Sequence, residues 1–304
     1  MLCKNVPGVR RILAVLALHF AVLACGPAPC PAAFEGCLVD SRAEATGDCW
    51  CVSHFPALSP APLPPPATGF ALGLSYRRPF GLTDLEEKDV VANVPLSWCI
   101  GSVGFTERGG GLYRERALSV TMSAAVPRAA PKRAQAAPAS KAQALRTSAS
   151  RTSPASLVSV SLSAAVFEVS VDAWRPARCA GLSAGARASP VGSVDVCVGM
   201  GNIVSGKTDL GLRQTFLAGV VVRPHQVLTL AAEIRRQPGE ESSFHLGAEL
   251  ELSGGAFLRC GLRTEPMELT MGFGVALEGF GLDTASSFHP VLGRTDSFSL
   301  SFSR

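Results

Sequence analysis

The chain has 304 residues, a length that suits one large β domain or two ordinary domains. Only 17% of the residues are charged and 47% are hydrophobic, whereas a soluble protein carries about 25% charged residues, so the composition favours a protein that shows apolar surface to lipid. The net charge of +4 is too small to indicate a nucleic acid partner.

The N-terminus has the pattern of an export signal. Arg10 and Arg11 precede an uncharged apolar run, residues 12–24, that is too short to span a bilayer. Residues 1–24 are therefore predicted to be a signal peptide. Two forms of processing stay open: lipidation of Cys25, which would make the mature chain a lipoprotein, or ordinary cleavage after Ala24.

Residues 25–68 are rich in cysteine and proline, and we predict that they are largely disordered. The proline run at 56–66 is typical of a stiff, extended spacer without a core of its own. A soft metal site is one interpretation of its thiols, with Cys37, Cys49, Cys51 and His54 as ligands. That spacing is not a common zinc pattern, and an exported chain meets an oxidising compartment, so we expect no metal and either disulfides or unpaired thiols.

Apolar and polar residues begin to alternate after residue 69, and the alternation predicts β-strands in two blocks, 69–126 and 155–304. Within the first block, the acidic patch 84–89 is predicted to be a solvated turn. In the second block the apolar positions change phase between Leu162 and Phe167, which predicts a tight turn or bulge near Ala165.

The stretch between the two blocks has a different composition. Residues 127–154 contain six basic residues and no acidic residue among Ala, Ser and Pro, and no apolar period survives. We predict a disordered basic insert. It is either a tolerated loop insertion or a surface for anionic lipid, glycan or a partner.

The last sixty residues alternate most regularly. Leu258, Cys260 and Leu262 fall on one face of a predicted strand, with Arg259 and Arg263 on the other. Short turns join such runs, which indicates antiparallel neighbours. One apolar face and one polar face are typical of a membrane barrel, so the fold predicted is an all-β, transmembrane, antiparallel up-and-down β-barrel of about 14 strands.

The same region resembles the PorV/PorQ-like outer-membrane proteins of the FadL-like barrel superfamily. The resemblance covers residues 226–302, and is looser over 69–126. It is carried by a G-A-E strand, an L-R-x-G-L strand, a G-F-G strand, an L-D strand and the turn H-P-V-L-G-R-T, which begins at His289. It implies a barrel in the outer membrane of a diderm bacterium, inserted by the barrel-assembly machinery and surrounded by outer-membrane lipid.

The residues with functional promise are charged or polar side chains on the predicted inner face. As candidate lumen-lining residues the alternation gives Glu233, Arg235, His245, Glu249, Glu251, Arg259, Arg263 and Asp283. Acids and arginines on neighbouring strands can pair, which allows charge inside a barrel. They either satisfy one another and fill the lumen, or line a path or hold a plug.

No catalytic motif is present: the sequence lacks a Gly-x-Ser-x-Gly elbow, a P-loop and a His-Glu-x-x-His helix. We therefore expect no enzyme, no cofactor and no catalytic residue. The resemblance implies passage of hydrophobic small molecules, such as long-chain fatty acids, or a docking role in protein export. The alternative is a surface-exposed lipoprotein whose soluble β domain binds a partner, with the apolar stripe buried between two sheets.

Overall fold

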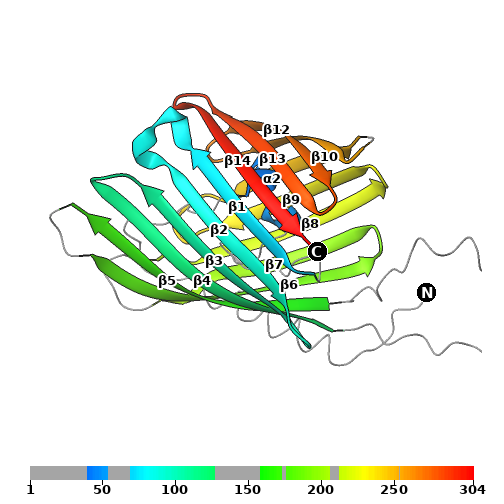
Figure 1. Cartoon of the computed structure of the whole chain (residues 1–304), viewed down its shortest axis with the longest axis horizontal. Helices are drawn as coiled ribbons and strands as arrows, with labels where there is room; N and C mark the ends of the chain where they lie inside the picture. The colour runs from blue at the N-terminus through cyan, green and yellow to red at the C-terminus, as the bar shows by residue number, and fades with distance from the viewer. Residues whose placement is uncertain (1–39, 54–68, 127–157, 173–175, 206–211, 253) are drawn as a thin grey trace, which may run out of the picture.

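The computed structural model describes residues 40–53, 69–126, 158–172, 176–205, 212–252 and 254–304. Within these residues the chain forms a closed barrel of fourteen strands, in which each strand pairs with its neighbours in sequence and β14 pairs with β1 (Figure 1). All of the pairings are antiparallel. The predicted fold class is confirmed.

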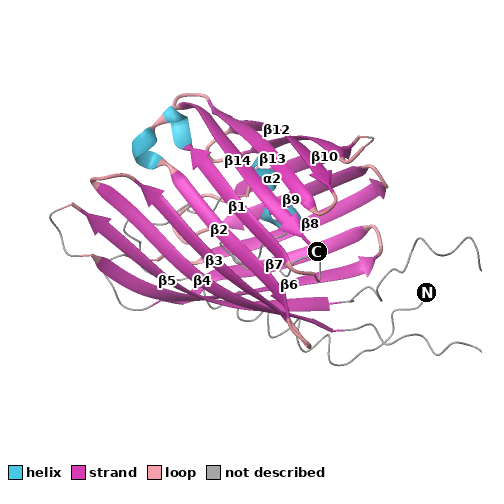
Figure 2. Cartoon of the chain, in the orientation of Figure 1, coloured by secondary structure: helices cyan, strands magenta, loops and turns pink. Residues whose placement is uncertain are grey.

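The strands follow one another with short connections in most places. They are β1 (Ala71–Arg78), β2 (Glu87–Pro95), β3 (Ile100–Gly109), β4 (Tyr113–Val126), β5 (Val158–Val171), β6 (Ala177–Val191), β7 (Val194–Ser205), β8 (Thr215–His225), β9 (Leu228–Arg236), β10 (Ser243–Glu251), β11 (Ala256–Arg263), β12 (Glu268–Leu277), β13 (Phe280–His289) and β14 (Gly293–Ser303). The helical elements are α2 (Ser41–Ala45), η1 (Trp50–Val52), η3 (Pro79–Gly81) and η4 (Thr83–Leu85). Figure 2 shows η3 and η4 between β1 and β2 at one rim, and α2 within the barrel.

The outer face of the sheet is apolar and its inner face is polar, which is the reverse of the surface and core of a soluble protein. On β14 the side chains of Phe298 and Leu300 are 45% and 43% exposed, whereas Ser297 and Ser299 are 5% and 9% exposed. The exposed alternate positions of the other strands are likewise mostly Leu, Val, Phe and Met, while many of the buried positions are Ser, Thr or charged. An apolar outside and a polar inside place hydrocarbon around the barrel. The aqueous sandwich with an inner apolar stripe is therefore wrong.

Two-residue turns close several hairpins. Glu278 and Gly279 join β12 to β13, and their φ angles are +48° and +89°. Turns with two positive φ angles match the right-handed twist of the flanking strands, and glycine adopts such angles without a steric penalty. The chain direction alternates from strand to strand, so both ends of the barrel sequence lie at one rim. We call it the terminal rim, and the opposite one the far rim.

β4, β5 and β6 are longer than a bilayer requires. They contain 14, 14 and 15 residues, whereas about 9–11 tilted residues cross the hydrocarbon core. Their far-rim ends carry outward ion pairs: Arg116 lies 2.7 Å from Glu107, and Arg178 lies 2.6 Å from Glu168. Charges on the outer face indicate that this part of the wall stands clear of the hydrocarbon.

The described residues show no helix with the length and apolarity to cross a membrane, a finding that does not concern strands. The predicted signal peptide 1–24, the lipidation site Cys25 and the whole of the insert 127–154 lie outside the described residues. The strand ends next to the insert, Val126 and Val158, lie at the terminal rim, because β4 runs toward that rim and β5 away from it.

Two predictions about the strands are corrected. The pairings of β5 with β4 and β6 run without a register shift from Val158 to Val169, so the change of phase near Ala165 is not a bulge. The acidic patch is not a solvated turn throughout: Glu87 and Asp89 lie on the inner face of β2 and are 1% and 2% exposed. Glu87 pairs with Arg77 and Arg108, at 3.3 and 3.1 Å.

Candidate functional site

A segment from the predicted disordered region lies inside the barrel. Residues 40–53, which we call the plug, contain α2, a turn and η1, and most of them are buried. α2 contacts β11, β12, β13 and β14, while η1 contacts β8 and β9 (Figure 1). The prediction that 25–68 is largely disordered is therefore wrong for these fourteen residues; the rest of that segment is outside the described residues.

Local sequence explains why the plug begins and turns where it does. The carboxylate of Asp40 accepts hydrogen bonds from the backbone N–H groups of Arg42 and Ala43, at 2.9 and 3.4 Å, and so caps the first turn of α2. The helix ends at Ala45, and the chain then passes through Gly47 and Asp48, whose φ angles are +73° and +62°. Left-handed backbone at two successive residues reverses the chain, so the plug enters and returns as a hairpin.

The turn of the plug rests directly on the barrel wall. A Cβ atom on Gly247 or Gly261 would overlap the backbone of Thr46 and Gly47, so only glycine permits this approach. Gly247 and Gly261 are cross-strand partners on β10 and β11 and form a seat for the turn. Next to the seat, Thr270 Oγ1 accepts a hydrogen bond from Gly47 N at 2.9 Å and donates to the carbonyl of Ala45 at 3.1 Å.

The first ion cluster joins the start of the plug to three strands, and we call it the Glu249 cluster. Arg42 donates Nε and Nη2 to the two oxygens of Glu249, at 2.9 and 2.6 Å. Arg259 donates Nε to the same carboxylate at 2.6 Å and also pairs with Asp283. Two guanidiniums and two carboxylates therefore neutralise one another inside the barrel, and such pairing is a condition for charge in a protein interior.

The second cluster holds the turn of the plug, and we call it the Asp48 cluster. Asp48 Oδ2 lies 2.7 Å from Arg235 Nη1 and 3.6 Å from Arg263 Nη1. Arg235 and Arg263 also bind acids of the wall, Glu233 at 2.7 Å and Glu268 at 2.6 Å. Burial would raise the pKa of Asp48, but the two guanidiniums outweigh it and lower the pKa to about 2.

Two further contacts fix the plug. His245 donates from Nδ1 to the carbonyl of Gly47 at 2.8 Å. Arg77 of β1 lies 3.4 Å from Glu44 of α2 and 3.3 Å from Glu87 of β2, so β1 also contributes to holding the plug. Arg42, Glu44 and Asp48 of the plug thus each meet an opposite charge on the wall, while Asp40 caps α2.

The predicted lumen-lining residues have these positions. Glu233, Arg235, His245, Glu249, Arg259 and Arg263 are all on the inner face of the wall that meets the plug. Asp283 joins them through Arg259. Glu251 is on the same face, opposite Phe257, but at the terminal rim and exposed.

Sequence reasoning missed the plug residues themselves, Arg42, Glu44 and Asp48. The available signal was short: Asp40 followed by Ser-Arg-Ala-Glu-Ala resembles a capped helix start. Cysteine and proline around it suggested a spacer instead. The wall motifs G-A-E and L-R-x-G-L had a role that only the structure shows, because Gly247, Glu249 and Arg259 belong to the seat or to the Glu249 cluster.

The apolar end of the plug crosses the lumen. Trp50, Cys51 and Val52 pack in one buried cluster with Leu217 and Val221 of β8. The same cluster includes Val91 of β2, which is almost opposite β8 in the ring. With α2 against β11–β14 and η1 against β8, the plug spans the lumen at this level.

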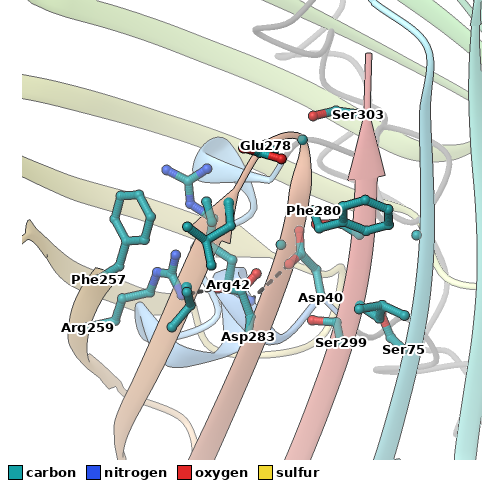
Figure 3. A pocket seen from close by; sticks show the side chains of 18 residues that line it. Asp40, Arg42, Ser75, Phe257, Arg259, Glu278, Phe280, Asp283, Ser299 and Ser303 are labelled. Atoms are coloured by element: carbon teal, nitrogen blue, oxygen red, sulfur yellow. Dashed lines mark hydrogen bonds and ion pairs between the residues drawn. The ribbon is translucent and has the colours of Figure 1, made fainter. Parts of the chain in front are cut away.

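A cavity of about 330 Å³ remains beside the plug near the terminal rim. Figure 3 shows Arg42, Arg259 and Asp283 at one side of it and Ser75 and Ser299 at the other. The lining residues on β1 and β14 include Gly73, Ser75, Ser299 and Ser301. Their small side chains leave this space open.

Apolar side chains occupy the inner face nearer the far rim, where they explain the change of phase in β5. Phe167 pairs across the strands with Ala117 and Cys179, and continues the inward positions of Ser161 and Ser163. The outward positions at that level become charged, as at Glu168. We call the inward group the mouth patch; its residues are Ala117, Phe167, Val169, Cys179 and Leu212, the last reaching the patch beside Gly181.

Among the described residues no group of three or more His, Cys, Asp and Glu side chains has the geometry of a metal site. Cys49 and Cys51 are buried thiols of the plug. Cys37 and His54, the other members of the metal interpretation, are outside the described residues.

No family model matches the sequence, and no curated protein matches it either. Solved structures do. The CymD monoaromatic hydrocarbon channel has a TM-score of 0.58 and 13% identity, covering 89% of this chain and 98% of its own. The Pseudomonas putida toluene transporter TodX has a TM-score of 0.51 and 10% identity, covering 87% and 96%.

At these identities the likeness concerns the fold. It does not separate the PorV/PorQ-like branch from other barrels of this architecture. The closed barrel and its apolar outer belt give this chain the fold of an outer-membrane β-barrel.

Proposed function

We propose that this protein is an outer-membrane channel for small hydrophobic molecules, and that the plug gates it. The observation that carries the proposal is a segment that spans the lumen and is held to the wall by ion pairs. A barrel with an apolar outer belt belongs in a bilayer. An element that spans its lumen must move, or be bypassed, before a molecule can pass through.

The attachment of the plug suits reversible opening. Burying an ion pair costs desolvation on both sides, so its net contribution is small even when its geometry is good. When the plug leaves, water enters and hydrates Arg42, Asp48 and their wall partners. The hydration offsets much of the lost attraction, whereas an entirely apolar seal would have no such compensation.

The mouth patch supports a hydrophobic substrate. Phe167 and Val169 line the inside of the wall where the outside carries Glu168 and Arg178. An apolar surface inside a part of the barrel that stands clear of lipid has no role in contacting the bilayer. It can hold an apolar molecule before passage, and the names of CymD and TodX describe proteins that pass monoaromatic hydrocarbon and toluene.

We place the terminal rim toward the periplasm. An exported chain approaches the outer membrane from that side, and both ends of the barrel sequence are at this rim. The mouth patch then faces the outside of the cell, and the cavity beside Arg42 faces the periplasm. A substrate would thus pass from the patch, past the displaced plug, to the cavity.

Uptake into proteoliposomes tests the proposal, with labelled oleate and labelled toluene as separate arms. We expect the wild-type protein to exceed empty liposomes with at least one of them, and Phe167→Asp together with Val169→Asp to reduce that uptake at least fivefold. Ser170→Asp is the matched control, because Ser170 is the outward neighbour and its substitution should leave uptake unchanged.

Two results would contradict the proposal. Uptake equal to empty liposomes for both compounds, also after deletion of residues 40–53, would exclude a hydrophobic channel. Equal loss of uptake in the control and in the patch variant would remove the mouth patch from it.

A further inference from the structure

Three thiols meet where the apolar end of the plug touches the wall. Cys49 and Cys51 flank Trp50, and Cys197 is on the inner face of β7. They are 0%, 1% and 0% exposed, and all three belong to the apolar cluster that includes Leu217. No transport or attachment role described so far uses them.

Two independent contacts place Cys51 over Cys197. Gly219 is the cross-strand partner of Cys197 on β8, and a Cβ atom on Gly219 would be 3.4 Å from both Cβ and Sγ of Cys51. Arg187 is the cross-strand partner of Cys197 on β6, and its Nη2 donates to the carbonyl of Cys51 at 2.7 Å. Cys51 therefore contacts both cross-strand neighbours of Cys197, one on β8 and one on β6.

These neighbours limit the distance between the Cβ atoms of Cys51 and Cys197. Directly opposite residues of antiparallel strands have Cβ atoms about 4.5–5.5 Å apart. The side chain of Cys51 rests against one such neighbour of Cys197, so these contacts allow a range of Cβ–Cβ separations for Cys51 and Cys197 that includes the distance that a disulfide spans. The absence of a side chain at Gly219 makes room for this approach.

We propose that Cys51 and Cys197 are a disulfide site that locks the plug to the barrel wall. In the structure both are thiols. The oxidant is a low-molecular-weight disulfide: its S–S bond breaks and takes two electrons, an S–S bond forms between Cys51 and Cys197, and the two thiol protons go to the released thiolates. An exported chain meets such oxidants, because disulfides persist in oxidising compartments.

Cys49 is the competing partner. A Cys49–Cys51 bond would close a ring through a single intervening residue, and disulfides with such constrained geometry are strained and readily reduced. Cys51 has one sulfur, so the two bonds exclude each other. Within the docked plug, the neighbouring thiol of Cys49 and burial raise the pKa of Cys51, so the thiols react while the plug docks rather than afterwards.

The site is tested by refolding the full chain from urea into detergent with either oxidised or reduced glutathione. Folding is checked by heat-modifiable migration, and thiols left unpaired are alkylated after denaturation. Trypsin gives peptide 43–77, with Cys49 and Cys51 as its cysteines, and peptide 188–207, with Cys197. We expect these two peptides to be linked, at least tenfold more in the oxidised sample, with Cys49 alkylated.

Single substitutions identify which sulfur atoms form the disulfide. Cys49→Ser should keep the link, whereas Cys51→Ser and Cys197→Ser should lose it. Cys197→Ala serves if the serine variant does not fold, and Cys260→Ser on the outer face should keep the link. Alkylation of both Cys51 and Cys197 in the oxidised, folded protein would overturn the proposal, as would a Cys49–Cys51 bond with Cys197 alkylated.

The lock is tested by ion conductance, which needs no substrate. The linked wild type should conduct at least threefold less than Cys197→Ser refolded under the same conditions. Equal conductance would overturn the lock. The lock rests on the proposed gating by the plug, but the peptide map does not, so a failed uptake experiment leaves the disulfide site standing.

Discussion

At the residue scale, glycine decides where the plug can rest. Gly247 and Gly261 alternate with apolar residues just as other wall positions do, and in the sequence they are no more than small residues of a barrel strand. In the structure they admit the backbone of Thr46 and Gly47 to the wall. A single methyl group at this point therefore acts on the plug rather than on the barrel.

Gly261→Val tests this at one position. The added side chain would occupy the place of the Gly47 amide, so we expect the plug to leave its seat and ion conductance to rise severalfold. The barrel should still fold, because β11 keeps its pairings. The control is Gly192→Val in the β6–β7 turn, where an added Cβ meets no atom within 4 Å. Unchanged conductance in Gly261→Val would show that the seat does not hold the plug.

At the element scale, the plug is a short hairpin that no regular pattern announces. α2 has five residues, fewer than an isolated helix needs, so its stability comes from the wall. Its charges are matched one by one: Arg42 with Glu249, Asp48 with Arg235 and Arg263, Glu44 with Arg77. The docked state should therefore depend on the ionisation of these groups.

Asp48 gives that dependence a definite pH window. Its pKa in the docked plug is about 2, below its ordinary value of 3.8, so docking is stabilised above pH 3.8 and loses this contribution as the pH falls toward 2. The shift corresponds to about 2 kcal/mol. Arg235, Arg263 and His245 are the groups that face Asp48.

Conductance measured between pH 5 and pH 2 checks this prediction. The wild type should open as the pH falls, and Asp48→Asn should already be open at pH 5 and change less. The difference between the two proteins isolates Asp48 from the other acids of the lumen. Parallel curves for both proteins would show that this carboxylate does not hold the plug.

At the scale of the whole molecule, the barrel is stabilised by its surroundings as well as by its own pairs. Its outer belt of Leu, Val and Phe is exposed in the folded chain, so a bilayer must cover it. Leu246, on the outward face of β10 opposite Leu262, represents the belt.

Leu246→Arg should cost about 2–4 kcal/mol of folding free energy in lipid vesicles if it is near the midplane. The cost reflects the transfer of a guanidinium into hydrocarbon. Trp98→Arg in the β2–β3 turn is the control, because charge near the interface costs about 0–1 kcal/mol. Urea titration of the vesicle-inserted proteins measures both. Equal stabilities would place Leu246 outside the hydrocarbon.

The sequence by itself determined the wall. Alternation with a period of two, short turns and low charge were enough for a membrane barrel of about fourteen strands, because each strand must show one face to lipid and the other to the lumen. The inner positions of Glu249 and Arg259 followed from the same alternation, which fixes the face of every residue in a strand.

Only the tertiary structure decided what fills the lumen. Arg42 and Glu249 are 207 residues apart, and no local pattern relates them. The plug is too short and too polar for its sequence to show the pattern of a buried element. Its fixed conformation depends on contacts with the barrel wall, which encloses it only after the barrel has closed. For the same reason the inward turn of Phe167 and the meeting of Cys51 with Cys197 could not be predicted, since both depend on which strands and segments share the enclosed space.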